Sequence, residues 1–362
     1  MPFCVFSCKN TPAGNNAVIF DFTGKETRLP VPAAGKLPSS WKGFNLLNMF
    51  YLGGQTTDTP FSEKEFKMMS DWGFNFVRIP IDYRILIRAG DWNNMNESAM
   101  RRLDKALEYG IKHDIHICLN LHRAHGYTVA SPAETTNLWT QAKPQEAFAR
   151  MWGFIAERYK NIPNEYLSFN LLNEPAGVDE KTYADVMKKA AGAIHARDPG
   201  RVIIADGLEY GRIPSHLIRE LGMAQAARGY EPFHLTHYRA DWVGGSDKYP
   251  LPKWPVVIDN ANVQNREWLK NTIVKPWDEL IKSGGGAMVG EWGAHNRTPH
   301  DVVLRWMEDN LVTFNEAGMG WALWNLTGSF GILNSGRNDV DYENCNGYKL
   351  DRKMLNLLQK YL

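Results

Sequence analysis

Two glutamates at the ends of short apolar segments are the residues of this chain best suited to do chemistry. Glu174 follows the apolar run 166–172 and Asn173, and Glu291 closes the run 286–290. A carboxylate at the end of a buried strand is costly unless it is paired or functional. Each glutamate alone could be a strand-end ion pair or a helix cap, but two of them on matched strand ends favour a shared site.

Two carboxyl groups held close together can divide acid and base chemistry between them. Neighbouring carboxylates push one pKa upward, so that one group keeps a proton to donate while the other stays ionised. Glu174 and Glu291 lie far apart in the sequence. Only a fold that gathers the ends of distant strands can therefore bring them together.

The overall composition is that of a globular protein with enough length for a large core. The chain has 362 residues, 44% hydrophobic and 22% charged, with a formal net charge of +1. Because it has no basic run and no apolar stretch of about 18 residues, we expect neither a nucleic-acid partner nor a membrane. The N-terminus lacks a signal-peptide pattern, so the protein is not exported or a signal has been removed. Its four cysteines show no metal-ligand spacing, and we expect no metal or cofactor.

From residue 41 onward, the pattern predicts alternating strands and helices. Apolar runs predict eight strands, at 42–48, 74–80, 115–122, 166–172, 201–206, 233–238, 286–291 and 320–325. Periodicity and capping signals predict helices at 62–72, 96–113, 144–159, 180–196, 214–221, 265–283, 299–316 and 351–362. Eight strand–helix units most economically form an α/β fold, a (β/α)8 barrel with its site at the strand C-termini. An open doubly wound sheet is the alternative, but no G-x-G-x-x-G follows the first strand.

Residues 1–40 fall outside these eight units and are rich in Pro, Gly and Asn. They contain one strand-like run, Val18–Phe22. An apolar edge strand of this kind can pack on its own domain or pair with a neighbouring molecule. We therefore expect an N-terminal arm or small β element that crosses the bottom of the barrel or joins a homo-oligomer.

The motifs at these strand ends resemble those of glycoside hydrolase family 5, the cellulase-type retaining hydrolases with a (β/α)8 barrel. The resemblance covers residues ~41–362, which would form the catalytic domain. It rests on six motifs: Gly43-Phe-Asn45, Phe76-Val-Arg-Ile-Pro80, Asn120-Leu-His122, Leu172-Asn-Glu-Pro175, Gly290-Glu-Trp292 and Ala322-Leu-Trp-Asn325. Any one motif would be weak, but their order on strands one, two, three, four, seven and eight is specific.

The resemblance implies a double displacement in which Glu174 is the acid/base and Glu291 is the nucleophile. It also implies that Arg78 lies beside Glu291, where a guanidinium would keep the carboxylate ionised and oriented. Asn173 would donate to the 2-hydroxyl of the sugar. A structural ion pair for Arg78 and a strand-end cap for Asn173 are the alternatives.

Further substrate-binding residues follow from the same resemblance. It places a substrate-binding histidine at His122 and a sugar platform at Trp324, whose indole face would stack on the ring. Asn45, in the first motif, belongs to the same expected set. Three tryptophans in the loops after strands three and six could bind sugar or pack under their loops: Trp139, Trp242 and Trp254.

Strand six departs from the family pattern. The family usually shows His-x-Tyr there, with the tyrosine hydroxyl on the nucleophile, whereas the expected strand 233–238 ends in adjacent His237 and Tyr238. Adjacent strand residues point to opposite faces unless a bulge intervenes. We still assign both to the substrate-binding set, with Arg239 or Asp241 as candidates for part of the role.

The leading expectation is a retaining glycoside hydrolase that cleaves β-linked glucan polysaccharides, with endo-β-1,4-glucanase as the first choice. A β-mannanase, a mixed-linkage β-glucanase or an exo-acting β-glucosidase would use the same machinery. A non-catalytic carbohydrate-binding barrel is the alternative from a different class, and the presence of both glutamates with Arg78 argues against it. A polysaccharide substrate would place the protein outside the cell.

Overall fold

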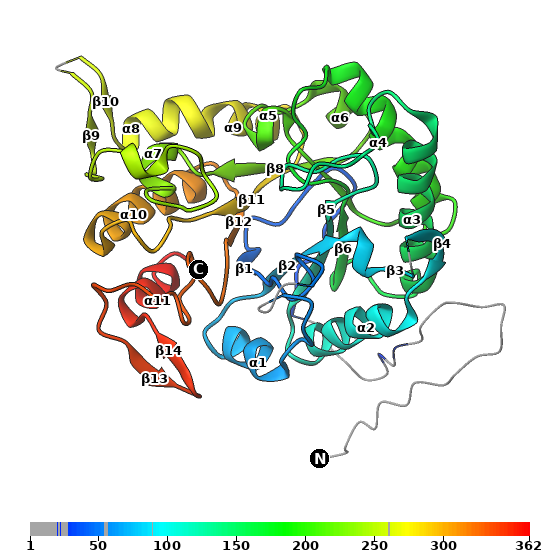
Figure 1. Cartoon of the computed structure of the whole chain (residues 1–362), viewed down its shortest axis with the longest axis horizontal. Helices are drawn as coiled ribbons and strands as arrows, with labels where there is room; N and C mark the ends of the chain where they lie inside the picture. Colours follow the sequence, from blue (N-terminus) through cyan, green and yellow to red (C-terminus); the bar gives the residue numbers. More distant parts are fainter. Residues whose placement is uncertain (1–19, 21, 23–27, 54–56, 89, 260) are drawn as a thin grey trace.

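A closed barrel of eight parallel strands forms the centre of the computed structural model (Figure 1). The structure describes residues 20, 22, 28–53, 57–88, 90–259 and 261–362. The barrel strands are β1 (Lys42–Asn45), β2 (Phe76–Asp82), β5 (His116–Arg123), β6 (Leu167–Asn170), β7 (Ile203–Asp206), β8 (Ala224–Gly229), β11 (Ala287–Trp292) and β12 (Gly320–Leu323). Around the ring their order is β1-β12-β11-β8-β7-β6-β5-β2. The predicted (β/α)8 barrel is confirmed.

Helices surround the barrel and cover its outer face (Figure 1). The longer ones are α1 (Glu63–Asp71), α2 (Glu97–Lys112), α3 (Ala142–Tyr159), α4 (Glu180–His195), α9 (Lys275–Lys282), α10 (His300–Glu316) and α11 (Arg352–Gln359). The short ones are α5 (Leu208–Gly211), α6 (His216–Glu220), α7 (Phe233–Thr236) and α8 (Arg266–Trp268), which continues into the π-helical turn η3 (Leu269–Val274). None of the helices in the described part of the chain is long and apolar enough to cross a membrane.

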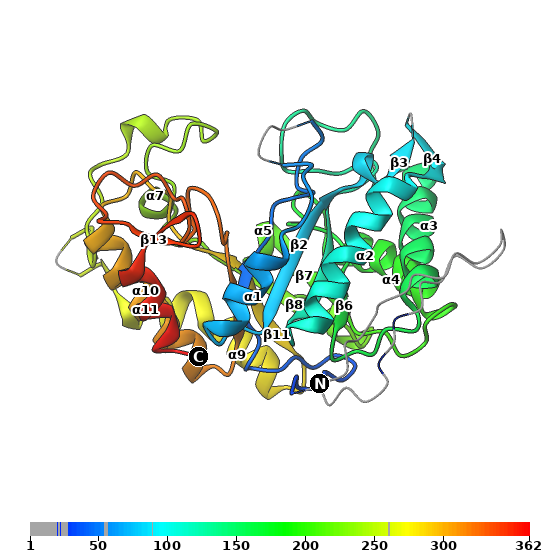
Figure 2. The same cartoon turned by 90° about the horizontal axis from the view of Figure 1, so that it is seen from below.

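Short hairpins and 3-10 turns occupy the loops between these elements. They are β3 (Ile87–Arg88) with β4 (Asp91–Met95), β9 (Val256–Val257) with β10 (Val263–Gln264), β13 (Glu343–Cys345) with β14 (Tyr348–Leu350), and the turns η1 (Tyr83–Ile85) and η2 (Ser246–Lys248). Figure 2 shows the β3–β4 hairpin and α7 on one side of the barrel, with α9 and the C-terminus on the other. The side with the hairpin is the side at which the barrel strands end.

The interior of the barrel changes from apolar to polar along the strands. Alternate residues of each strand face inward, and an apolar cluster fills the interior near the strand starts: Trp41, Phe76, Cys118, Ile204, Ala224, Ala226, Met288 and Ala322. Two residues further along the same strands, the buried side chains become polar: Arg78, Asn120, Asp206 and Arg228. The alternation that builds the core therefore also gathers polar groups at the C-terminal ends.

The sixth predicted strand, 233–238, is wrong. Residues Phe233–Thr236 form α7, which begins after Pro232, whose fixed φ suits the start of a helix. The sixth barrel strand is β8, whose Ala, Gln, Arg and Gly residues carry little of the usual strand signal. Small residues are accommodated there because the barrel interior has to fit large neighbours such as Trp41.

The described part of the N-terminal segment lies against the start of the strands. Phe20 is buried, and the ring of Phe22 stacks on Tyr166, just before β6, with the centroids 5.7 Å apart. The chain at 35–37 passes so close to Gly286, before β11, that a Cβ there would lie 2.6 Å from the Gly35 carbonyl oxygen. Of the predicted strand, residues 18, 19 and 21 lie outside the described residues. These described residues lie at the barrel bottom, which is one of the two arrangements that the sequence left open.

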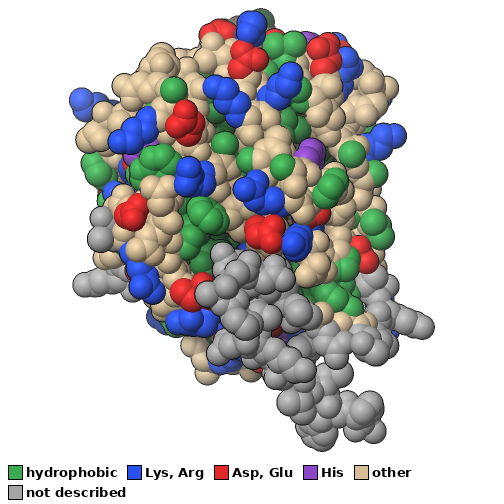
Figure 3. Space-filling model, turned by 90° about the vertical axis from the view of Figure 1, so that its right-hand side faces the viewer, with side chains coloured by type: hydrophobic (Ala, Val, Ile, Leu, Met, Phe, Trp, Pro, Cys, Tyr) green, Lys and Arg blue, Asp and Glu red, His purple; other side chains and the backbone are tan. Residues whose placement is uncertain are grey.

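The molecular surface mixes charges of both signs. On the face shown in Figure 3, lysine and arginine side chains are interspersed with acidic and apolar ones. This distribution accords with a net charge near zero. Binding to this face would therefore depend on local groups more than on a long-range field.

Candidate active site

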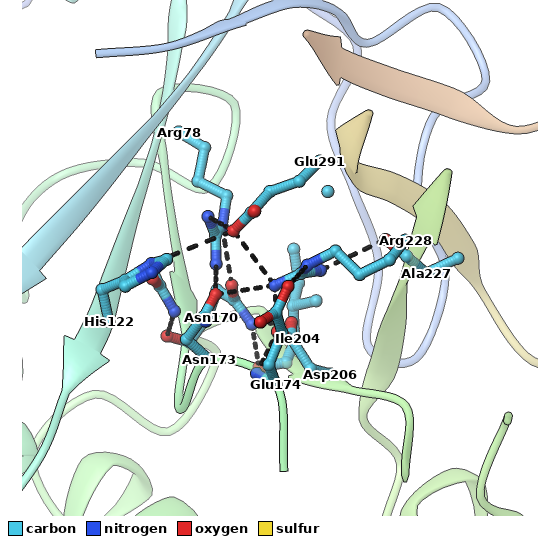
Figure 4. A network of polar contacts seen from close by, with 12 residues as sticks. Arg78, His122, Asn170, Asn173, Glu174, Ile204, Asp206, Ala227, Arg228 and Glu291 are labelled. Atoms are coloured by element: carbon cyan, nitrogen blue, oxygen red, sulfur yellow. Dashed lines mark hydrogen bonds and ion pairs between the residues drawn. The ribbon is translucent and has the colours of Figure 1, made fainter. Parts of the chain in front are cut away.

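Glu174 and Glu291 come together where the barrel strands end (Figure 4). Glu291 lies in β11, and Glu174 follows β6. Both contact the guanidinium of Arg228, whose Nε is 2.9 Å from Glu174 Oε1 and whose Nη2 is 3.2 Å from Glu291 Oε1. Because these nitrogens belong to one planar group, the two carboxylate oxygens can be no more than roughly 8.5 Å apart.

The backbone of Glu174 is held from both sides in an unusual conformation. Its φ is 50°, in the left-handed region that non-glycine residues adopt at a cost of about 1–2 kcal/mol. The Tyr127 hydroxyl donates to the Glu174 carbonyl oxygen at 2.6 Å and accepts from the Ala176 N–H at 2.8 Å. The Glu174 N–H donates to Asp206 Oδ2 at 2.9 Å. These bonds fix the direction in which the Glu174 side chain leaves the backbone.

The carboxyl of Glu174 titrates in the neutral range. Burial raises its pKa to about 7; the negative charges of Glu291 and Asp206 add to the increase, and Arg228 opposes it. The side chain is still 16% exposed. A carboxyl of this kind can hold a proton near neutral pH and exchange it with a bound molecule or water.

The carboxylate of Glu291 is more deeply enclosed, with 4% of its side chain exposed. Arg78 Nη1 donates to Glu291 Oε1 at 2.6 Å, and the Tyr230 hydroxyl donates to Oε2 at 3.1 Å. Three asparagine side-chain oxygens also accept from Arg78, at 2.9–3.0 Å: Asn45 from the same Nη1, Asn170 from Nε and Asn173 from Nη2. These bonds to its two oxygens fix the orientation of this carboxylate.

His122 and Trp324 form an aromatic wall beside the carboxylates. Their rings stack at 5.4 Å between centroids with an interplanar angle of 24°, and Phe50 packs edge-on against both. Burial holds the pKa of His122 well below its usual range, and the charges of Arg78 and Arg228 lower it further. The imidazole is therefore neutral, with Nδ1 3.9 Å from the carboxylate of Glu291.

Among the buried polar atoms that have no hydrogen-bond partner within the described residues, two belong to site residues predicted from the sequence. They are His122 Nδ1 and Asn173 Nδ2. The oxygen of the same Asn173 amide accepts from Arg78 at 2.9 Å and from Arg228 at 2.7 Å, so the orientation of this amide is fixed. Buried polar groups without partners are costly, and a hydroxyl-bearing ligand would satisfy them.

The structure brings Asn45, Arg78, His122, Asn173 and Trp324 together with the two glutamates, but not His237 and Tyr238. The His237 ring stacks on Phe233 at 3.9 Å, and burial lowers its pKa to about 3. The Tyr238 carbonyl accepts from His295 Nδ1, and its ring lies under Arg239. In the described structure, neither side chain bonds to either carboxylate, because α7 replaces the expected strand.

The three loop tryptophans differ in their surroundings. Trp139 packs edge-on against Tyr127 at 4.8 Å, and Trp254 is buried and donates to Asp309 Oδ2 at 2.9 Å. Both pack under their loops. Trp242 is 62% exposed and stands edge-on to His295 at 5.1 Å. Of the three, Trp242 is the most exposed and therefore the best placed to contact a ligand.

Arg228, Tyr230 and Asp206 contact the site but were not predicted from the sequence. Arg228 lies in β8 and Tyr230 follows it, whereas the sixth strand was predicted at 233–238. Their spacing, Arg228-Gly-Tyr230, is the family's His-x-Tyr pattern with arginine in place of histidine. Asp206 ends the correctly predicted strand β7, and a carboxylate at a strand end is the same sequence signal that points to Glu174.

A match to a family model shows the protein family to which this chain belongs. The model described as Cellulase (glycosyl hydrolase family 5) matches residues 33–329, most of the chain. The chain belongs to glycoside hydrolase family 5. As a member of this family it is a glycoside hydrolase, and the carboxylate pair at the barrel mouth is its candidate catalytic centre.

Individual proteins and solved structures are also similar to this chain. Endoglucanase C of Acetivibrio thermocellus is 27% identical over 314 residues, covering 80% of this chain and 91% of the relative. Cellodextrinase A of Ruminococcus flavefaciens is 24% identical over 292 residues, covering 77% and 83%. A crystal structure described as a glycoside hydrolase matches with a TM-score of 0.83 and 37% identity over 88% of this chain and 98% of its own. Endoglucanase Cel5A from Thermotoga maritima shares the fold, with a TM-score of 0.72 and 22% identity over 88% and 97%.

Proposed function

We propose that this family 5 hydrolase is a retaining endo-β-1,4-glucanase in which Glu291 is the nucleophile and Glu174 is the acid/base. The observation that carries these roles is the unequal setting of two carboxyls that share one guanidinium. Glu291 is enclosed and fixed by Arg78 and Tyr230, which suits an ionised attacking group. Glu174 is partly exposed and has a pKa near 7, which suits a group that exchanges a proton.

In the first step, Glu291 attacks the anomeric carbon and forms a glycosyl–enzyme ester. The glycosidic C–O bond breaks, and Glu174 gives its proton to the departing oxygen. Arg78 and Tyr230 hold the attacking oxygens in place while the negative charge of Glu291 moves into the new bond. Loss of that charge also removes one of the causes of the raised pKa of Glu174, so its ionised form is favoured.

In the second step, the ionised Glu174 acts as a base. It takes a proton from a water molecule, whose oxygen attacks the anomeric carbon and releases Glu291 as a carboxylate. Two displacements at the same carbon give net retention of configuration. The return of the negative charge on Glu291 raises the pKa of Glu174 again, which leaves it protonated for the next cycle.

The proposed sugar contacts use the unpartnered groups of the site. Asn173 Nδ2 is a donor for the 2-hydroxyl, a hydrogen bond that strengthens in the transition state. His122 Nδ1 is available to a neighbouring hydroxyl, and Trp324 offers its indole face as a platform. Trp242, the exposed loop tryptophan, would bind a sugar further along the chain of the substrate.

The substrate proposal favours β-1,4-glucan because two relatives are named endoglucanase C and cellodextrinase A. A β-mannanase, a mixed-linkage β-glucanase or an exo-acting β-glucosidase would use the same two carboxylates and differ in the loops around them. Such a polymeric substrate would be met outside the cell.

A substrate panel tests the proposal. The protein is incubated in parallel with carboxymethylcellulose, barley β-glucan and glucomannan, with Glu291→Ala as the matched inactive control. We expect reducing sugar from carboxymethylcellulose together with a fast fall in viscosity, which identifies cleavage inside the polymer. Release from glucomannan alone would favour a mannanase, and equal release by Glu291→Ala would place the chemistry elsewhere.

A further inference from the structure

A cluster of five buried or partly buried charges lies at the mouth of the barrel (Figure 4). It contains three carboxylates and two guanidiniums: Glu174, Glu291, Asp206, Arg78 and Arg228. Asp206 is fully buried, and the two arginines are 1% and 4% exposed. When every group is ionised, the cluster has one negative charge in excess. It becomes neutral when one carboxyl holds a proton, which is the state that acid catalysis needs.

The hydrogen bonds indicate which carboxyl takes that proton. Asp206 accepts from Arg228 through a close contact, from Asn170 Nδ2 at 3.0 Å and from the Glu174 backbone N–H at 2.9 Å. Glu291 contacts three donors, two of them guanidiniums. Within the described residues, the carboxyl of Glu174 accepts one hydrogen bond, from Arg228 Nε at 2.9 Å. The least stabilised carboxylate is protonated first, and this is Glu174.

We propose that Arg228 and Asp206 are a pair of positioning residues that set the proton affinity of Glu174 in opposite directions. Arg228 stabilises the ionised form of Glu174 through its direct bond. Asp206 opposes this effect with its negative charge, binds the same guanidinium, and fixes the backbone of Glu174. The inference rests on the proposed role of Glu174 as the acid/base.

The two residues act within a set of groups that face Glu174 from several elements. These are Glu291 from β11, Arg228 from β8, Asp206 from β7, Tyr127 from the loop after β5 and Tyr230 after β8, while Arg78 from β2 bonds to Glu291. The hydroxyls of both tyrosines have pKa values raised by burial, so they remain neutral. Apart from the nucleophile Glu291, the charged groups that contact Glu174 are therefore Arg228, through its side chain, and Asp206, through the backbone N–H of Glu174.

The arginine at this position changes the charge balance of the family pattern. A histidine two residues before Tyr230 would lose its positive charge near neutral pH. Arg228 keeps its charge at every working pH. A permanent positive charge bonded to Glu174 would by itself keep that carboxyl ionised and remove its proton. Asp206 supplies the fixed negative charge that offsets this effect.

The pH dependence of kcat/KM on a cello-oligosaccharide tests the pair. Asp206→Asn removes a negative charge, so the alkaline limb, which reports the loss of the Glu174 proton, should move to lower pH by about 1 unit. Arg228→Gln removes a positive charge, so the limb should move to higher pH by a similar amount. The double variant should return it toward the wild-type position. Opposite shifts that cancel are a result that structural damage does not give.

A second measurement separates this inference from the proposed function. The protonated carboxyl band of Glu174, assigned by its loss in Glu174→Gln, is titrated by infrared difference spectroscopy in each variant without any turnover. Asp104→Asn is the matched control, because it breaks a buried pair with Arg158, at 2.6 Å between helices α2 and α3, far from the site. We expect it to lower stability without moving the band. An unchanged Glu174 titration in both single variants, or shifts in the same direction, would overturn the inference, whereas full activity of Glu174→Gln would overturn the proposed function.

Discussion

At the scale of residues, the two glutamates are chemically identical and differ only in what surrounds them. Glu291 contacts two guanidiniums and a phenol, and Glu174 lies at the edge of the cluster with 16% of its side chain exposed. The same difference in environment is what divides nucleophile from acid in a retaining pair. The assignment of roles can therefore be tested by removing each carboxylate in turn.

Chemical rescue by azide should distinguish the two carboxylates. Glu174→Ala should still form the glycosyl–enzyme from an aryl glycoside with a good leaving group, and then stall because no base activates water. Azide needs no base, so it should restore turnover and give the β-glycosyl azide. Glu291→Ala should lose several orders of magnitude in rate, and azide should attack the substrate directly to give the α-azide. The anomeric configuration of each azide product is determined by NMR. An α-azide from Glu174→Ala together with a β-azide from Glu291→Ala would mean that the roles are reversed.

The raised pKa of Glu174 should also appear in the stability of the protein. The folded-state pKa is near 7 and the ordinary value is 4.5, so the folded protein binds a proton that the unfolded chain releases. The stability from this proton is fully present below pH 4.5 and is lost as the pH rises through 7. Glu174→Gln cannot ionise. Its free energy of unfolding, relative to that of the wild type, should therefore increase by a few kcal/mol from pH 4.5 to pH 8.

Thermal denaturation at both pH values checks this prediction. Glu63→Gln is the control, because hydrogen bonds from Lys112 and His113 lower the pKa of Glu63, so that its contribution to stability changes below pH 4.5 and should differ little between the two pH values compared. The prediction fails if the advantage of Glu174→Gln over the wild type is the same at pH 4.5 and pH 8.

At the scale of elements, seven of the eight barrel strands and the longer helices could be predicted from apolar runs and helical periodicity. β8 could not, since its sequence Ala-Gln-Ala-Ala-Arg-Gly lacks branched and aromatic residues, and its place depends on the closure of the barrel. The segment 233–238 alternates like a strand, but Pro232 starts a helical turn there. The position of Trp139 under its loop depends on contacts with distant residues that a local pattern does not contain.

The shift of the sixth strand leads to a matched pair of variants. Tyr230→Phe removes the hydroxyl that donates to Glu291 Oε2, a bond to a charged group worth about 1.5–3 kcal/mol. We expect kcat/KM to fall roughly tenfold to a hundredfold. Tyr238→Phe, in the misplaced strand, should change it by less than about twofold. Initial rates on one soluble glucan give kcat/KM for both variants. A larger loss of kcat/KM in Tyr238→Phe than in Tyr230→Phe would show that Tyr238, as first predicted, is the tyrosine that serves the site.

At the scale of the whole molecule, β11 connects the two ends of the barrel. Its last residues include Glu291, and just before its first residue Gly286 lies under the backbone of the N-terminal segment. Phe20 and Leu29 are buried, and Phe22 stacks on Tyr166. Burial of each such side chain contributes about 1.5–3 kcal/mol, so the segment should act as a cover for the barrel bottom.

A double-mutant comparison should show whether this cover contributes to stability. In the full chain, Gly286→Ala would bring a Cβ to 2.6 Å from the Gly35 carbonyl oxygen and 2.7 Å from Lys36 Cα, and overpacking of this kind costs about 1–3 kcal/mol. Deleting residues 1–38 should lower stability by several kcal/mol through lost burial, and it also removes the atoms that the new Cβ would meet. In the truncated chain, Gly286→Ala should therefore cost little or nothing.

Urea denaturation of the four proteins measures this coupling, and sedimentation velocity of the full and truncated chains tests whether the segment also joins copies of the protein. An equal loss of stability from Gly286→Ala in the full and truncated chains, or a truncation that leaves stability unchanged, would show that the segment does not cover the barrel. The value of kcat should stay unchanged in all four proteins, because the carboxylates lie at the opposite end of the barrel.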